Sequence, residues 1–210
     1  MRLRQAQTGF TLVELVLVIV IIGILAAVAF RSGSQLFETA KTEQTKEELE
    51  DLAFGIAGNP DLQNNGVRSD FGYVGDVGAV PPHLDALVTN PGGYATWNGP
   101  YVSSRYLQAS DDYKKDAWGN NYLYTPGITI ASPVGIVRRV ADSKGDLVDN
   151  EISGLVLDFD GTPPGEDRDS ITVFVIHPDG AGGWQSRTSG VDAGGFFMID
   201  SIPLGNHSLG

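Results

Sequence analysis

The chain has 210 residues and a formal net charge of −12, which leaves room for one long helix and one or two small domains. So acidic a chain lacks the basic face that phosphate contacts need, and this argues against nucleic acid as a partner. It contains 27 Gly, 11 Pro and no Cys, so disulfides and thiolate metal sites are excluded. Most of the Gly and Pro lie beyond residue 55, where we expect loops and short strands.

The N-terminus combines a short positive segment with a long apolar one. Residues 1–9 are polar and carry Arg2 and Arg4, and residues 10–30 are almost wholly apolar. As a helix, this run measures about 30 Å, the hydrocarbon thickness of a bilayer. The arginines that precede it place residues 1–9 in the cytoplasm and the rest of the chain outside. We therefore expect a single transmembrane helix.

A secretory signal peptide is the alternative interpretation, and residues 26–29 (Ala-Ala-Val-Ala) offer a small-residue cleavage site for it. Glu14 argues against this alternative, because a carboxylate within a membrane span costs roughly 2.5–3.5 kcal/mol. A discarded signal has no need of such a residue. Gly9, a flexible residue placed where the charged leader meets the apolar helix, also favours a different class of leader.

The segment from Gly9 to Leu15 (Gly-Phe-Thr-Leu-Val-Glu-Leu), with the apolar run after it, closely resembles the class III signal of type IV pilins and type II secretion pseudopilins. The resemblance implies that a prepilin peptidase cleaves after Gly9 and that the new amine of Phe10 is methylated. It also implies insertion in the bacterial inner membrane, with the soluble head in the periplasm. Pilins of this family usually carry a proline just after the apolar segment, where this chain has Arg31.

In such a subunit, Glu14 is expected to take part in assembly. It lies about one helical turn beyond Phe10, whose amine becomes cationic after cleavage. In a staggered filament, the Phe10 amine of an incoming subunit can pair with the Glu14 carboxylate of an assembled one. The pair would favour the docked register, because an unpaired charge in hydrocarbon is costly. The alternative is that Glu14 merely reaches the membrane interface.

The apolar pattern predicts that the same helix continues into a soluble head and ends at Gly55 or Gly58. Leu49, Leu52 and Ile56 recur at helical spacing and should face the core. The stretch 41–48, rich in Lys and Glu, is predicted to be solvated. Leader and helix thus occupy residues 1–9 and 10–58.

A globular head is predicted over residues 59–152. Residues 81–87 should form a loop leading into a short helix, and residues 98–102 and 116–127 should each run from a loop into a strand. The last segment, with Asn-Gly-Pro-Tyr before it, resembles the Asp-x-Trp-Gly-x-x-Tyr-x-Tyr signature of the major type II secretion pseudopilin.

Within this signature, residue chemistry suggests the roles. Trp118, Tyr122 and Tyr124 are expected to supply apolar area to a small core. Gly119 should permit a tight turn and Asp116 should cap backbone amides. An aromatic platform for a sugar or nucleotide is the functional alternative.

The resemblance also implies a calcium loop near the end of the head. Residues 141–152 occupy that place, and Asp142, Asp146 and Asp149 offer hard oxygen ligands. Lys144 lies within the loop and the glycine spacing of the family is incomplete, so an acidic surface loop is the alternative. Calcium is the one cofactor that the sequence suggests.

Residues 153–210 alternate apolar strands with Gly/Pro turns, which indicates a small antiparallel β-domain. The order resembles the carboxypeptidase regulatory-like β-sandwich, a structural and recognition module without catalysis. Such a fold usually adds a final strand, so either the module or the gene model is expected to be truncated. Four carboxylates in this region are expected to be turn and surface residues: Asp158, Asp160, Asp167 and Asp169.

No catalytic motif is present, and no two of His83, His177 and His207 share a metal-ligand spacing. We therefore expect an α+β protein that is not an enzyme: a long N-terminal helix packed on a small antiparallel sheet, followed by a β-sandwich-like domain. The resemblance implies a filament subunit that polymerises with itself and with other pseudopilins. It further implies processing by a prepilin peptidase and methyltransferase and assembly on an inner-membrane platform. The alternative is a minor pilin or adhesin that displays the β-domain for surface binding.

Overall fold

The computed structural model describes the backbone of residues 9, 11–106 and 111–210, and within these the side chains of residues 28–32 and 104 are not described. Two compact units divide the chain, residues 1–43 and 44–210. Arg2, Arg4 and Phe10 lie outside the described residues.

Helix α1 runs from Leu12 to Ala57, close to the predicted bounds, and the Arg31 region does not interrupt it. It ends where Gly58 adopts a φ of 79°, a left-handed conformation that glycine tolerates best. Arg68 caps this end, because its Nη2 donates to the carbonyl oxygens of Ala57 at 2.5 Å and Gly58 at 3.1 Å. These contacts satisfy carbonyls that the last helical turn leaves free.

The head packs its core on the last part of α1. Leu49, Leu52 and Ile56 are buried as predicted, together with Tyr73 and Leu87 from two short helices that follow. The short elements of the head are, in chain order, β1 (Gln63–Asn64), β2 (Val67–Arg68), α2 (Gly72–Val77), η1 (Leu84–Leu87), η2 (Ser104–Tyr106), η3 (Asp112–Lys114), β3 (Leu123–Thr125), β4 (Thr129–Ala131), β5 (Val137–Arg139) and α3 (Gly145–Val148). Strands β3, β4 and β5 form an antiparallel sheet in sequence order.

The expected strand at residues 98–102 is wrong, because this segment forms no strand. Its side chains pack as part of the core instead: Val102 is buried, and the Tyr101 ring meets Tyr73 and Trp97 edge to face. The short helix after residue 81 is confirmed as the single turn η1.

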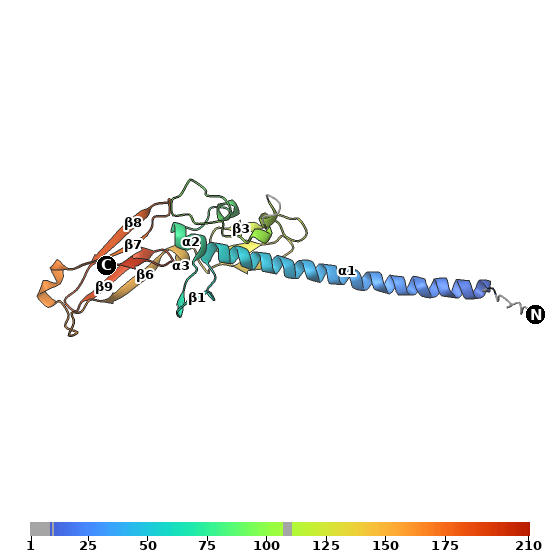
Figure 1. The fold of residues 1–210 in the computed structure, drawn as a ribbon, viewed down its shortest axis with the longest axis horizontal. Helices are drawn as coiled ribbons and strands as arrows, with labels where there is room; N and C mark the ends of the chain where they lie inside the picture. The colour runs from blue at the N-terminus through green and yellow to red at the C-terminus, as the bar shows by residue number, and fades with distance from the viewer. Residues whose placement is uncertain (1–8, 10, 107–110) are drawn as a thin grey trace, which may run out of the picture. The chain divides into compact units, whose positions relative to one another are not determined.

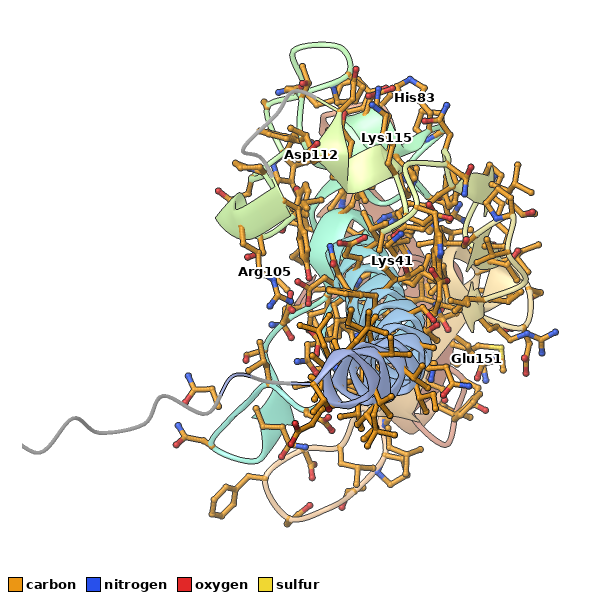
Figure 2. All side chains as sticks on the ribbon, turned by 90° about the vertical axis from the view of Figure 1, so that its right-hand side faces the viewer. Lys41, His83, Arg105, Asp112, Lys115 and Glu151 are labelled. Carbon is orange, nitrogen blue, oxygen red and sulfur yellow. The ribbon has the colours of Figure 1, made fainter. Side chains whose placement is uncertain are left out.

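Two ion pairs join the head to α1. Arg105, labelled in Figure 2, contacts Asp51 at 2.9 Å, and Arg138 of β5 contacts Glu50 at 3.2 Å. Both pairs are largely exposed, so each contributes at most about 1 kcal/mol.

The C-terminal strands form two small sheets around a second core. β6 (Asn150–Leu155) pairs with β9 (Phe196–Ile202), and β7 (Thr172–Pro178) lies between β8 (Trp184–Gly190) and β10 (Ser208–Leu209), all antiparallel (Figure 1). A 3-10 helix of six residues, η4 (Gly165–Ser170), precedes β7. Val175 of β7 and Phe197 and Ile199 of β9 are buried between the sheets. The predicted α+β class, with a sandwich-like C-terminal part, is confirmed.

Close backbone contacts join this sandwich to the head. Gly180 N donates to Val77 O and Leu204 N donates to Leu147 O, both at 2.8 Å. A Cβ added at Gly78 would lie only 2.4 Å from Pro178 O, so glycine is required where α2 meets β7. Both cores thus belong to the compact unit of residues 44–210.

Candidate functional site

The N-terminal end of α1 is held by a reciprocal cap between Thr11 and Glu14. Thr11 Oγ1 accepts from Glu14 N at 3.3 Å, and Glu14 Oε2 lies 3.4 Å from both Thr11 N and Thr11 Oγ1. This is a capping box, in which an N-cap threonine and a glutamate three residues later satisfy each other's free amides. Glu14 is exposed, so its carboxylate remains accessible to a second partner. Gly9 is exposed as well.

An aliphatic surface follows immediately along α1. Every residue from Leu12 to Leu25 except Glu14 and Gly23 is a large aliphatic residue, and these side chains are between 47% and 79% exposed. They surround the helix, and a helix that is apolar on all sides belongs in a membrane or in a large apolar core. Leu36 and Phe37, further along, are about as exposed, at 71% and 69%. This surface needs a covering that the chain itself does not supply within the described residues.

Among the residues that the structure describes, no helix has both the length and the apolarity of a membrane-crossing segment. Residue 10 and the side chains of residues 28–30, which belong to the predicted span, lie outside the described part of the chain.

The Asp-x-Trp-Gly signature forms a tight turn. Asp116 Oδ1 accepts from the backbone amides of Trp118 at 3.0 Å and Asn120 at 2.8 Å, and Gly119 has a φ of 85°. Burial alone would raise the pKa of Asp116, but hydrogen bonds from Ser132 and these amides outweigh it and hold that pKa below the ordinary value. The predicted roles of Asp116 and Gly119 are confirmed.

The turn docks on α1 through polar residues that sequence reasoning misplaced. The stretch 41–48 was expected to be solvated, but Thr45 and Glu48 are buried. Thr45 Oγ1 accepts from Ala117 N at 3.2 Å, and Glu48 Oε2 accepts from Tyr122 Oη at 2.6 Å. The helix uses these residues to bind the signature turn.

Of the signature aromatics, the two tyrosines pack as predicted and the tryptophan does not. Tyr122 is buried and Tyr124 packs against the head core. Trp118 is only half-buried and is not part of that core, so its predicted role there is wrong.

Two of the three proposed calcium ligands are engaged in other contacts. Asp142 pairs with Arg139 at 2.5 Å, and Asp146 accepts from Ser143 N at 2.8 Å and from Ser143 Oγ at 3.0 Å. Within the described part of the chain, no three acidic or histidine side chains group as a metal site. The residues present therefore do not fit a calcium ion in this arrangement, and calcium binding through Asp142, Asp146 and Asp149 stays a prediction from the resemblance.

Two histidines that are far apart in sequence lie together in the fold. The rings of His177 on β7 and His207 before β10 are 6.0 Å apart between centroids, nearly perpendicular. Sequence spacing gave no signal for this pair, because a strand pairing between β7 and β10 brings it together.

Two family descriptions match the sequence. The family described as "Prokaryotic N-terminal methylation motif" matches residues 4–30. The family described as "Type II secretion system (T2SS), protein G" matches residues 72–151, which leaves residues 152–210 outside it.

Curated relatives agree with these matches. A type II secretion system core protein G from Xanthomonas campestris is 34% identical over 59% of this chain and 73% of the relative. One from Pseudomonas aeruginosa is 30% identical over 70% of this chain and 93% of the relative. The fimbrial protein EcpC of Eikenella corrodens is 37% identical over 51% of this chain and 59% of the relative. No solved structure matches the chain at a comparable level.

Proposed function

The chain belongs to the type II secretion system protein G family of pseudopilins, and from this premise we propose that it is a structural subunit of a filament assembled from the inner membrane. The observation that carries this proposal is the aliphatic surface of α1 between Leu12 and Leu25. Burying one such side chain stabilises by roughly 1.5–3 kcal/mol, so the surface strongly favours any apolar environment. The bilayer provides it before assembly, and neighbouring α1 helices provide it in the filament.

Processing and register follow from the N-terminus. Prepilin peptidase is proposed to cleave between Gly9 and Phe10, and methylation of the Phe10 amine follows. The capping box holds the Glu14 carboxylate at the first turn of the helix, where it can receive the cationic amine of a neighbouring subunit. The partners of the chain are then other copies of itself, other pseudopilins, the peptidase and the inner-membrane assembly platform. A catalytic role is not proposed.

N-terminal sequencing of the mature protein tests this proposal. A start at methylated Phe10 supports assembly after processing by prepilin peptidase. A start near Phe30 indicates an ordinary signal peptide and overturns the proposal, because the aliphatic surface would then be discarded.

A minor subunit that displays the β-sandwich for surface binding is a second candidate. It is favoured by the strands beyond residue 151, which lie outside the protein G match. This part of the chain exposes apolar side chains, with Phe159 in the loop after β6 wholly exposed and Phe196 and Met198 of β9 partly so. Abundance separates the candidates, since a major subunit is plentiful in sheared filaments and a tip protein is scarce.

A further inference from the structure

A cavity of about 300 Å³ lies where the β-sandwich meets the head. Its lining includes Gly78 and Ala79 from the head and residues of β7, β8 and the Ser201–Pro203 segment from the sandwich. Its polar lining is rich in hydrogen-bond donors, which come from Lys144, His177, Gln185 and Arg187. The volume is at the lower end of the range for small-molecule sites.

Two residues that line the cavity each carry a buried polar atom with no hydrogen-bond partner among the described residues: His177, at Nε2, and Arg187, at Nε. His177 is 1% exposed. Its Nδ1 lies 2.9 Å from Pro178 O, and because a carbonyl only accepts, Nδ1 must carry a proton. Nε2 is then the nitrogen left without a partner. Leaving such groups unpaired costs about 1–3 kcal/mol each, which favours an occupant that satisfies them.

The charges around His177 are mainly positive. Arg187 of β8 and Lys144 of the loop before α3 face the cavity. Asp179, the one carboxylate in the lining, is engaged elsewhere, because its Oδ1 accepts from Ala181 N and Gly183 N at 2.8 Å. Asp200 of β9 is 80% exposed and lies 3.9 Å from Arg187 Nη1.

His207, which lies beside His177, is a second imidazole and adds no negative charge that would offset Arg187 and Lys144. Its Nε2 donates to Pro203 O at 2.7 Å, and its buried Nδ1 has no partner within the described chain. Burial first, and then the charges of His207 and Arg187, lower the pKa of His177. A positive cavity in a chain of net charge −12 is suited to an anion rather than to a metal cation.

We propose that this cavity binds a tetrahedral oxyanion, either the phosphate ion or the phosphate group of a small ester. Arg187 Nε and Lys144 Nζ donate to the anion's oxygens. One proton lies between His177 Nε2 and a phosphate oxygen, carried either by the imidazolium or by a P–OH group. No bond is made or broken, and the site is independent of filament assembly.

Proton uptake gives the site a diagnostic pH dependence. When phosphate binds as the dianion, one proton must enter with it, so affinity rises as the pH falls. For the uptake of one proton, the affinity changes by at most about tenfold per pH unit. In the Arg187→Gln variant, the loss of a charge-assisted bond should weaken binding by about tenfold or more.

Isothermal titration of the full chain in detergent micelles tests the proposal, with inorganic phosphate and with glycerol 3-phosphate as separate titrants. The measurements are made near pH 5.5 and near pH 7.5, on either side of the ordinary histidine pKa of about 6.5. Arg139→Gln is the matched control, because Arg139 is an exposed arginine paired with Asp142 outside the cavity. His177→Gln should abolish the proton uptake that accompanies binding of the dianion near pH 7.5, and thermal melts verify that each variant is folded.

Tighter binding of glycerol 3-phosphate identifies the ester as the ligand, and tighter binding of inorganic phosphate identifies the free ion. Both results support the site if Arg187→Gln weakens binding and Arg139→Gln does not. Should a variant fail to fold, proton uptake by the unaltered chain, measured in buffers of different ionisation enthalpy, still tests the role of His177. Absence of binding up to about 10 mM of either titrant overturns the proposal, as does equal affinity in the two arginine variants or binding of the dianion near pH 7.5 without proton uptake.

Discussion

Replacing Tyr122 by Phe should test how the signature turn is held on α1. Tyr122 Oη donates to Glu48 Oε2 at 2.6 Å, and both residues are only 8% exposed. Burial, and then the Glu48 carboxylate, raise the pKa of Tyr122 far above its ordinary value, so the hydroxyl stays a donor at any working pH. In the Tyr122→Phe variant, the Glu48 carboxylate would still have Gln44 as a partner, whose Nε2 lies 2.8 Å from Glu48 Oε1.

A hydrogen bond to a charged group contributes about 1.5–3 kcal/mol. For a unit of the size of residues 44–210, each kcal/mol shifts the melting temperature by about 2–4 °C, so Tyr122→Phe should lower it by roughly 3–12 °C. Thermal unfolding of the full chain in detergent, followed by circular dichroism, measures this shift.

A double-mutant cycle with Glu48→Gln separates this bond from other effects of the substitutions. We expect a coupling energy of about 1 kcal/mol or more between the two positions. A coupling near zero would refute the reasoning, because the two side chains would then contribute independently and the buried carboxylate would not anchor the turn.

Three further perturbations have definite expected outcomes. Arg68→Gln should lower the free energy of unfolding in urea by about 1–3 kcal/mol, because the substitution removes the side chain that caps the C-terminal end of α1. Unchanged stability would show that water caps this helix end equally well. Folding lowers the pKa of His177, so the stability that this residue contributes is fully present above its unfolded pKa, near 6.5, and is lost as the pH falls through the lowered pKa of the folded state. His177→Gln should therefore flatten the decline of the unfolding free energy at low pH, and an identical pH profile in the variant would contradict this account. Chelation with EGTA should leave the melting temperature unchanged, because Asp142 and Asp146 already contact Arg139 and Ser143. A decrease that calcium reverses would instead support the predicted calcium loop.

The sequence predicted best what depends on local pattern. Helical spacing identified Leu49, Leu52 and Ile56 as core residues, and Gly58 follows the end of α1 as one of the two ends that the sequence offered, whereas Gly55, the other, lies within the helix. Asp116 was predicted to cap amides because the side chain of an aspartate in a turn hydrogen-bonds to nearby backbone N–H groups wherever it occurs.

Contacts between distant segments could not be predicted in this way. Glu48 belongs to a charged stretch and would be solvated in an isolated helix, but a hydroxyl from 74 positions later makes its burial favourable. His177 and His207 meet only because β10 pairs with β7. Such partners are set by tertiary packing and leave no periodic signal in the chain.

The central claim is that Glu14 is retained in an apolar helix because it neutralises the amine of a neighbouring subunit. Its capping box offers a rival reason, and two variants separate the two. Glu14→Gln keeps an N3 side chain that can complete the box but removes the charge, whereas Thr11→Ala removes the N-cap hydroxyl and keeps the charge. The decisive measurement is the yield of sheared filaments from cells that express each variant with the full assembly machinery. We predict that filaments are lost in Glu14→Gln and largely retained in Thr11→Ala; normal filaments from Glu14→Gln would contradict the claim.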